Sequence, residues 1–581
     1  MAATHQFSGK QNTLTAAVLF LATAAFVLWQ NLHVAVLWDL SYLLDISWRI
    51  AVGQVPYRDF PLVHPPLTFL LQATIQHLTG RHYWLVIAYA ALTGGAATVL
   101  TWRILFRILH GRVAEAWTMS LLLAAPLCVL GVYSIYPHPI YDCDCAVAIL
   151  FALFLLQRLP VAEDSPNGSF RRWSLILFAG SAIVLPLFFK QNMGLPFLFS
   201  VIAGILLLLL TAAIGKQANS ASSGEPKSVT LLKLLAAIAL SLIAAILLLQ
   251  ITAGLNNYLQ WTVHFAAQRR LPGLADMLSV YQQPSFAWTI PTLGLGLILL
   301  RSRLAARLWV RILSLALASA PFVGSLIYLF LSDDLDDRAD NLLALWPLLL
   351  LASAAFALAE LRKGITLHRL LPFFVLAAIH GTFLSQQLWG STYAIWPLLI
   401  ILIAYILNAL PAAWPGTTIT FASVISATFL ICGSLYAIGH ERLNYIQIPD
   451  EALYRSALPP LRGMADRGPF LPDFEELVQF AEKEIPPQDG ILLLPGEEPF
   501  YYATGRTPQF PIQIFDQTTD PYSAAELMQQ VRQRNIRWII VKTRLQSNQN
   551  PLPDLANTLT SVARDFALYR KLNGYDVYRL R

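Results

Sequence analysis

Residues 14–37 read LTAAVLFLATAAFVLWQNLHVAVL and contain no Lys, Arg, Asp or Glu. An α-helix needs ~20 mostly apolar residues to cross the hydrocarbon core of a bilayer, so this run predicts a membrane-spanning helix. The run is too long for the core of a signal peptide, and no A-x-A cleavage pattern follows it. We therefore expect this helix to be retained and the chain to be an integral membrane protein.

The same length rule applies along the first 440 residues. Further apolar runs of spanning length lie at 84–108, 114–135, 143–158, 174–190, 194–214, 230–252, 287–300, 311–331, 341–360, 370–386, 394–412 and 417–438. Together with the first run they predict about thirteen crossings. We therefore expect residues 1–440 to form a polytopic α-helical membrane domain.

The composition supports a membrane domain and excludes other classes of protein. Of the 581 residues, 56% are hydrophobic and 13% are charged, whereas soluble proteins average about 25% charged residues. The 4 cysteines are too few for a disulfide scaffold. The net charge of +6 is small and dispersed, so we expect no nucleic-acid partner.

The basic residues predict the orientation, because cytoplasmic loops are enriched in Lys and Arg. With a cytoplasmic N-terminus, the inner connections carry the basic clusters at 103–112, 158–172, 216–227, 301–311 and 362–369. The outer loops are then 38–83, 136–142, 253–286, 332–340 and 387–393. An odd number of crossings leaves the C-terminal segment outside. We expect the protein in an inner (cytoplasmic) membrane of bacterial type.

The C-terminal segment, 441–581, changes character. Its apolar runs shorten to strand length and alternate with polar helical stretches. The pattern predicts helices at 473–484 and 524–535 and strands at 491–495, 537–542 and 575–580. We find no G-x-G-x-x-G, P-loop or metal-ligand spacing in this segment. The segment therefore predicts a small extracytoplasmic α/β domain without support for a nucleotide site.

The most informative residues lie in the first outer loop, 38–83. It reads Trp38-Asp39-Leu40-Ser41-Tyr42, then Gly53-Gln54-Val55-Pro56-Tyr57-Arg58-Asp59-Phe60, then His64-Pro65-Pro66-Leu67. Asp39 directly follows a long apolar run. A carboxylate at that point can stay ionised at the membrane surface and meet both a lipid headgroup and a water-soluble partner.

This pattern resembles the first external loop of the GT-C superfamily of polyprenyl-phosphate-sugar-dependent glycosyltransferases. It is most similar to the bacterial protein-mannosyltransferase-like and lipid A aminoarabinose transferase-like branch. There, an Asp after helix one precedes a G-x-x-P-Y-x-D-F type run and a Pro-Pro-Leu. Similar features recur at 139–144 (Pro-Ile-Tyr-Asp-Cys-Asp), 189–192 (Phe-Lys-Gln-Asn), 346–347 and 396–397 (both Trp-Pro).

Two positions depart from the family pattern. Leu40 stands where the family usually has a second acid beside the first. His64 stands where the aminoarabinose branch tends to carry Lys. These differences leave the substrate and the metal requirement open.

The resemblance implies an integral-membrane glycosyltransferase that moves a hexosyl or pentosyl group from a polyprenyl-phosphate donor to an acceptor hydroxyl, with inversion. The leaving phosphate is already a stable anion, so no general acid is needed, in contrast to glycoside hydrolysis. One carboxylate that takes the acceptor proton is enough. Asp39 is our candidate for this catalytic base, and Asp45 and Asp59 are the alternatives. The competing interpretation is that Asp39 caps a helix.

The donor phosphate requires cations at the membrane surface. The candidates on the outer side are Lys190, Arg269, Arg270 and Arg338. The residues expected to line the substrate cavity are Tyr42, Tyr57, Arg58, Asp59 and His64.

Asp142 and Asp144 flank Cys143 at the outer start of an apolar run. Such a pair could ligate Mg²⁺ or Mn²⁺, as the corresponding acidic pair does in oligosaccharyltransferases of the same superfamily. The competing interpretation is that they stabilise the positive N-terminal end of a helix. No other cofactor is indicated.

The acceptor remains open among envelope lipids such as lipid A, surface polysaccharide and protein hydroxyls. Two other classes of function are also open. A lipid-linked-sugar transporter or flippase predicts internal repeats and charged or broken helices at membrane depth, and both are scarce here. A non-catalytic lipid-sugar-binding assembly protein would differ from the transferase only in activity.

Overall fold

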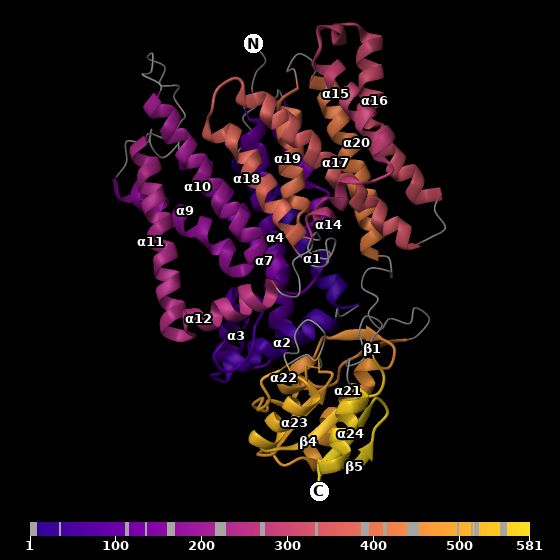
Figure 1. Cartoon of the computed structure of the whole chain (residues 1–581). Coiled ribbons are helices and arrows are strands. Elements are labelled where there is room, and N and C mark those ends of the chain that lie inside the picture. Colours follow the sequence, from indigo (N-terminus) through magenta and orange to yellow (C-terminus); the bar gives the residue numbers. More distant parts are fainter. Residues whose placement is uncertain are drawn as a thin grey trace.

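The computed structural model describes residues 9–33, 37–110, 115–133, 136–159, 169–214, 228–267, 273–331, 335–384, 394–410, 415–438, 452–496, 499–512, 515, 522–545 and 555–581. Figure 1 shows a bundle of long helices with a smaller domain of mixed helices and strands at one end, next to α2 and α3. We call this the domain end of the bundle.

Within the described residues, every predicted apolar run falls mainly on one helix or on a pair of consecutive helices. The helices are α1 (Gly9–Asn31), α4 (Tyr83–Leu109), α5 (Ala116–Ala124) with α6 (Leu127–Leu130), α7 (Tyr141–Leu156), α9 (Ser169–Phe189), α10 (Gln191–Ile214), α11 (Ser228–Thr252), α15 (Phe286–Arg301), α16 (Leu308–Leu331), α17 (Leu335–Leu361), α18 (Leu367–Gly381), α19 (Trp396–Asn408) and α20 (Pro415–Ile438).

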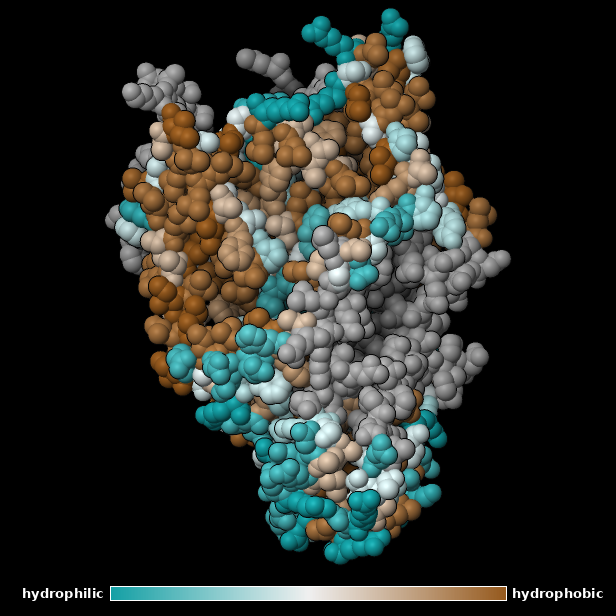
Figure 2. Space-filling model, viewed as in Figure 1, coloured by the Kyte–Doolittle hydropathy of each residue, from teal (hydrophilic) through white to brown (hydrophobic). Residues whose placement is uncertain are grey.

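The described helices make the chain a multi-pass membrane protein. Seven of them are long and apolar enough to span a bilayer on their own, and up to 8 if the bent pair ending in α15 counts as one span. Large apolar side chains such as Ile251 and Leu331 point outward and are 81% and 76% exposed. Figure 2 shows a hydrophobic surface over the bundle and a hydrophilic one over the C-terminal domain. The count of about thirteen crossings stays a prediction.

Two predicted outer loops contain short helices. The segment 38–83 forms α2 (Leu37–Ala51) and α3 (Leu67–Thr79). The segment 253–286 contains α12 (Leu255–Leu259), η1 (Gln260–Phe265), α14 (Leu274–Leu278) and η2 (Ser279–Tyr281). These helices are too short to span a bilayer. The hydropathy runs therefore identified the long helices but not the short ones at their ends.

The C-terminal domain contains all five predicted elements. They correspond to α21 (Phe470–Glu484), β3 (Gly490–Leu494), α23 (Ala524–Gln533), β4 (Ile536–Lys542) and β6 (Tyr575–Leu580). The remaining elements of this domain are β1 (Leu453–Arg455), the 3₁₀ turn η6 (Pro459–Leu461), β2 (Ala465–Arg467), α22 (Phe500–Thr504), α24 (Leu555–Asp565) and β5 (Phe566–Lys571). The 3₁₀ turns η3 (Arg303–Ala306) and η4 (Thr382–Leu384) lie in the bundle. The predicted boundary at 440/441 lies outside the described residues.

A four-stranded sheet in the order β3-β4-β6-β5 organises this domain. β3 and β4 are parallel, and β6 pairs antiparallel with both β4 and β5. Successive side chains of a strand point to opposite faces of a sheet. Leu492 and Ile539 accordingly belong to a small core on one face, whereas Ile491 and Ile540 belong to the large core.

The large core is continuous with that of the membrane bundle. It includes Leu43 and Leu44 of α2 together with Phe500 and Tyr501 of α22. One face of the C-terminal sheet thus connects, through α22, to the helix that begins near Asp39. Apolar burial of this kind fixes the domain against the bundle.

Candidate functional site

A tight turn between α2 and α3 shapes the region of the predicted cavity. Tyr57 has a φ of 70°, in the left-handed region that non-glycine residues rarely adopt. Its backbone N–H donates to Phe60 O (2.9 Å), and its hydroxyl donates to His64 O (2.7 Å). Its ring meets Tyr258 edge to face, with centroids 5.1 Å apart. Tyr57 is buried, and these contacts hold its backbone in a conformation that costs free energy. The turn is therefore rigid.

Residues that are distant in the sequence meet beside this turn. The rings of His64 and Tyr141 stack at 3.9 Å, and Tyr42 meets His64 edge to face at 6.1 Å. Lys190 Nζ lies 4.2 Å from the centroid of the Tyr141 ring and 3.0 Å from the Asp142 carboxylate. We call Tyr42, His64, Tyr141, Asp142 and Lys190 the domain-end cluster.

The hairpin between α9 and α10 places Lys190 in the domain-end cluster. Pro186 lies inside the last turns of α9, and its carbonyl accepts from the Lys190 backbone N–H (3.0 Å). The Lys190 carbonyl accepts from Gly194 N–H (2.8 Å). A Cβ at Gly194 would lie 2.3 Å from backbone atoms of Pro186 and Leu187, so only glycine allows this close approach.

The first turn of α7 holds both acidic residues of the predicted metal pair. Asp144 is 3% exposed and accepts hydrogen bonds from Thr68 (2.6 Å), Tyr89 (2.9 Å) and Tyr133. These donors join α3, α4 and the segment before α7 to one carboxylate. Asp142 instead accepts from Lys190. The two carboxylates therefore have separate sets of partners.

The donor set around Asp142 and Asp144 was compared with what a divalent cation needs. Mg²⁺ and Mn²⁺ prefer several oxygen ligands. Among the described residues no group of three or more His, Cys, Asp or Glu side chains gathers anywhere. Hydroxyl and ammonium donors already hold both carboxylates, so these residues do not fit a metal centre as they stand. The predicted Mg²⁺ or Mn²⁺ site stays a prediction.

Arg58 and Asp59 lie apart from the domain-end cluster. They form an ion pair at 2.9 Å, with side chains 54% and 33% exposed. Asp59 also accepts from the Val55 backbone N–H (2.7 Å). The hydrogen bond from Arg58 is the main cause that lowers the pKa of Asp59. This pair stabilises a surface turn.

Four predicted site residues have side chains outside the described part of the structure. Asp39 lies in the first turn of α2, and Arg338 lies near the start of α17, but only their backbone is described. Arg269 and Arg270 lie in the segment 268–272, which is not described at all. Their predicted roles as base and as phosphate ligands stay predictions.

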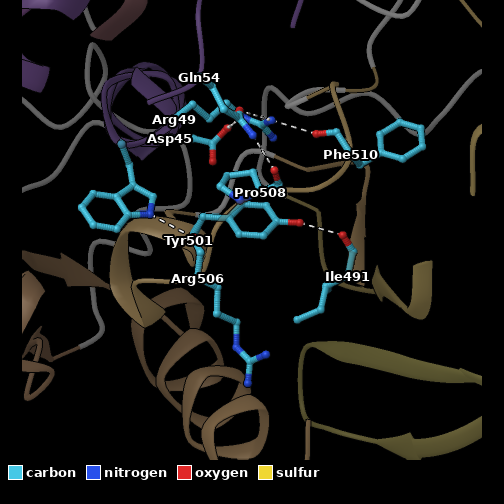
Figure 3. Close-up of polar contacts among 9 residues, drawn as sticks. Asp45, Arg49, Gln54, Ile491, Tyr501, Arg506, Pro508 and Phe510 are labelled. Carbon is cyan, nitrogen blue, oxygen red and sulfur yellow. Dashed lines mark hydrogen bonds and ion pairs between the residues drawn. The ribbon is translucent and has the colours of Figure 1, made fainter. Parts of the chain in front are cut away.

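The C-terminal domain accepts hydrogen bonds from side chains of α2 and of the loops that flank α3. Figure 3 shows Arg49 and Gln54 reaching toward the backbone at Phe510 and Pro508. The hydrogen bonds of this domain contact are Trp48 Nε1 to Arg506 O (2.9 Å), Arg49 Nη1 to Phe510 O (2.8 Å), Gln54 Nε2 to Pro508 O (2.7 Å), and Arg81 Nη1 to Tyr502 O (2.8 Å) and Ala503 O (2.7 Å).

Arg49 is the centre of the domain contact. It is 1% exposed, donates to Asp45 (2.9 Å), and lies 5.7 Å from the ring centroids of both Phe60 and Tyr501. Burial raises the pKa of Asp45, and the charge and hydrogen bond of Arg49 oppose that rise. Asp45, an alternative base, is thus already engaged by Arg49.

Sequence reasoning missed several of these residues. Thr68, Tyr89 and Tyr133 come from three separate segments, so nothing local connects them to Asp144. Asp45 and Arg49 have the i, i+4 spacing of a helical ion pair, and this signal could have indicated α2.

No family model and no curated protein matches the sequence. Among solved structures, ArnT from Cupriavidus metallidurans bound to undecaprenyl phosphate aligns over 97% of this chain and 97% of its own. The TM-score is 0.50 and the identity 10%. The oligosaccharyltransferase of Archaeoglobus fulgidus in the apo form aligns over 92% of this chain and 70% of its own, with a TM-score of 0.48 and 10% identity.

At this identity the likeness concerns the fold. It confirms the predicted architecture, a polytopic helical membrane domain followed by a small C-terminal α/β domain. The chain shares the overall fold of this ArnT structure.

Proposed function

We propose that this protein is an integral-membrane glycosyltransferase that moves one sugar from a polyprenyl-phosphate donor to an acceptor hydroxyl. The observation that carries this proposal is the domain-end cluster. There Tyr42 contacts His64 of the first loop, His64 stacks on Tyr141, and the Tyr141 ring contacts Lys190, the candidate phosphate ligand, on a chain with the fold of the ArnT structure. A surface turn or a helix cap alone would not require these segments to converge.

Two observations support a polyprenyl-phosphate donor: the lipid bound to a similar structure and the positive charge of Lys190. The Cupriavidus metallidurans ArnT structure with this fold is bound to undecaprenyl phosphate. In our protein, the Lys190 ammonium lies in the domain-end cluster with side-chain exposure of 8%. An ammonium that is shielded from water interacts strongly with a phosphate. We assign the donor phosphate to Lys190, which would exchange part of its contact with Asp142 for the phosphate.

Asp39 is our proposed base. Its carboxylate takes the proton of the acceptor hydroxyl while that oxygen bonds to the anomeric carbon of the sugar. The bond from the anomeric carbon to the phosphate oxygen breaks at the same time, and its electron pair leaves with the polyprenyl phosphate. Direct displacement of this kind inverts the anomeric centre. A positioned base contributes about 10²–10⁴-fold to the rate.

The domain contact supports the placement of Asp39. Four side chains of α2 and its neighbouring loops donate hydrogen bonds to the C-terminal domain. The same helix, α2, contains Asp39 in its first turn and the buried Asp45–Arg49 pair further along. The domain thereby fixes the helix whose first turn contains Asp39. We further propose a cytoplasmic N-terminus, an inner membrane, and a domain end on the outer side, because the basic clusters lie in the opposite connections.

The test is a transfer assay with purified protein, a panel of radiolabelled polyprenyl-phosphate sugars, and envelope extracts as acceptors. The wild type should transfer label from at least one donor, and Asp39→Asn should lose about 10²–10⁴-fold in rate. Asp59→Asn is the matched control, because it removes a carboxylate from the same loop whose exposed partner is Arg58. Its rate should stay near that of the wild type.

Three results would overturn the assignment. Absence of transfer with every donor and every extract would favour a flippase or a non-catalytic binding protein. An active Asp39→Asn variant would remove Asp39 as the base. Loss of wild-type transfer with a chelator, restored by Mg²⁺ or Mn²⁺, would give Asp142 and Asp144 a metal-binding role in place of the Lys190 contact.

A further inference from the structure

A pocket lies at the end of the bundle opposite the C-terminal domain. It opens where α17 ends, α18 begins and α19 ends, and its volume is about 430 Å³ including the open mouth. α19 ends at Asn408 and α20 begins at Pro415, so α20 starts near the end of α19 that lines the pocket. α20 then runs the length of the bundle toward the C-terminal domain (Figure 1). The pocket is therefore remote from the domain-end cluster.

The charges beside the pocket are mostly positive. Glu360, in the lining, accepts from Arg301 (3.0 Å) and from Lys363 (2.7 Å), so two cations surround one carboxylate. Arg369 also lines the pocket, and its Nη1 donates to Gly364 O (2.9 Å). A guanidinium carries five N–H donors, so most of its capacity remains for a ligand. The set has a net positive charge and favours an anion.

The pocket also contains polar atoms with no protein partner. Ser353 is 3% exposed, and its Oγ has no hydrogen bond within the described part of the chain. Asn408 Oδ1 is likewise without a partner there. Buried polar groups are normally satisfied, so unsatisfied ones that line a cavity point to a ligand or to water. Ser353 can donate or accept, and Asn408 Oδ1 accepts from a hydroxyl.

Apart from His368 and Tyr405, the remaining walls are apolar. Phe356, Pro372 and Ile406 face the same space. A free anion gains nothing from such walls, whereas the first methylene groups of a lipid's acyl chains bury apolar surface against them. Basic pockets between helix ends at a membrane surface are suited to anionic lipid headgroups.

We propose that this pocket binds the headgroup of an anionic phospholipid that carries both a phosphate and free hydroxyls. Arg369, with the two cations around Glu360, attracts the phosphate. Ser353 and Asn408 bind the hydroxyls, and the apolar walls receive the first methylene groups of the acyl chains. This lipid site is separate from the proposed donor site and does not depend on it. A phosphatidylglycerol headgroup has the required chemistry.

The test is native mass spectrometry of the full-length protein in detergent with added lipid. Phosphatidylglycerol should bind the wild type more tightly than phosphatidylcholine does, and Arg369→Gln should weaken phosphatidylglycerol by about fivefold, the contribution of one basic residue near a membrane surface. Arg303→Gln is the matched control, because Arg303 is an exposed basic residue of the same basic region that does not line the pocket. It should bind phosphatidylglycerol as the wild type does.

A second variant tests the hydroxyl contacts without changing the charge. Asn408→Leu should weaken phosphatidylglycerol but leave phosphatidic acid, which has no headgroup hydroxyls, unchanged. Equal weakening by Arg369→Gln and Arg303→Gln would mean general attraction and overturn the site. Binding of inorganic phosphate or glycerol 3-phosphate as tight as that of the lipid would identify a soluble anion as the ligand and overturn the lipid assignment. Thermal unfolding of each variant verifies that it is folded.

Discussion

Two buried ion pairs lie near the domain end of the bundle, and their surroundings differ. Arg49 bonds Asp45 and the Phe510 carbonyl and lies against two aromatic rings. Lys190 bonds Asp142 and lies over the Tyr141 ring, and within the described residues its ammonium has no second hydrogen-bond acceptor. The first pair joins two parts of the chain. The second leaves donors of a buried cation for another acceptor.

The difference shows how burial alone fails to identify function. Both cations are at least 90% buried, and both have an acid within 3.0 Å. What separates them is the use of their remaining donors. A buried guanidinium that donates to a carbonyl across the domain contact is structural, whereas a buried ammonium over an aromatic ring, with one carboxylate partner, is suited to a phosphate.

The largest expected effect is on the structural pair. Arg49→Met should lower the free energy of unfolding by about 3–5 kcal/mol at neutral pH, because it leaves the Asp45 carboxylate buried and unpaired. Hydrogen exchange should increase at residues 499–512, which lose the bond to the Phe510 carbonyl. Adding Asp45→Leu should restore part of the stability. The control is Arg58→Met, an exposed pair, which should leave the unfolding temperature unchanged. An equal loss in both variants would contradict the structural role.

A smaller effect is expected at the hairpin that positions Lys190. Gly194→Ala should destabilise the protein by about 1–3 kcal/mol, because its Cβ would meet backbone rather than a flexible side chain. The distortion should also reduce the transfer rate. Gly294→Ala is the matched control, since its Cβ would meet nothing within 4 Å. Thermal unfolding with the transfer assay measures both effects. Equal stability of the two variants would contradict the close approach of α9 and α10.

The smallest expected effect is on the stability of the C-terminal domain, which should depend on pH through Asp466. Burial raises the pKa of Asp466 to about 7, against about 3.9 in an unfolded chain. As the pH rises, the unfolded state therefore loses this proton before the folded state does. Asp466 lowers the free energy of unfolding increasingly between about pH 4 and pH 7, and by a constant amount above pH 7. Asp466→Asn should stabilise the domain by at least about 1–2 kcal/mol more at pH 8 than at pH 4.5. Unfolding temperatures at both pH values test this, and a gain that is independent of pH would contradict it.

The sequence predicted the long helices well, because hydropathy over a whole span depends on local composition alone. Runs such as 230–252 and 417–438 lie within α11 and α20. The length rule places the short helices α2 and α3 in a predicted loop, because each has too few residues to span a bilayer. α2 is helical because it packs between the bundle and the C-terminal domain, and this contact joins residues more than 400 positions apart.

The candidate site was predicted in part for the same reason. The loop pattern identified Tyr42, Tyr57 and His64, and the structure brings them to Lys190 and Asp142. Sequence alone could not separate these residues from Arg58 and Asp59, because the turn around Tyr57 decides which side chains face the cluster. Asp39 remains a prediction that rests on the loop pattern and on its place at the start of α2.

The most direct test of the central claim is the affinity of the purified protein for polyprenyl phosphate. Our account predicts that Lys190→Gln weakens binding by about tenfold or more, because a charge-assisted contact with the phosphate is lost. Asp142→Asn should bind at least as tightly as the wild type, since the ammonium then has no competing carboxylate, and Arg58→Gln should bind as the wild type does. Unchanged affinity in Lys190→Gln, or equal losses in Lys190→Gln and Arg58→Gln, would contradict a donor-phosphate site at Lys190.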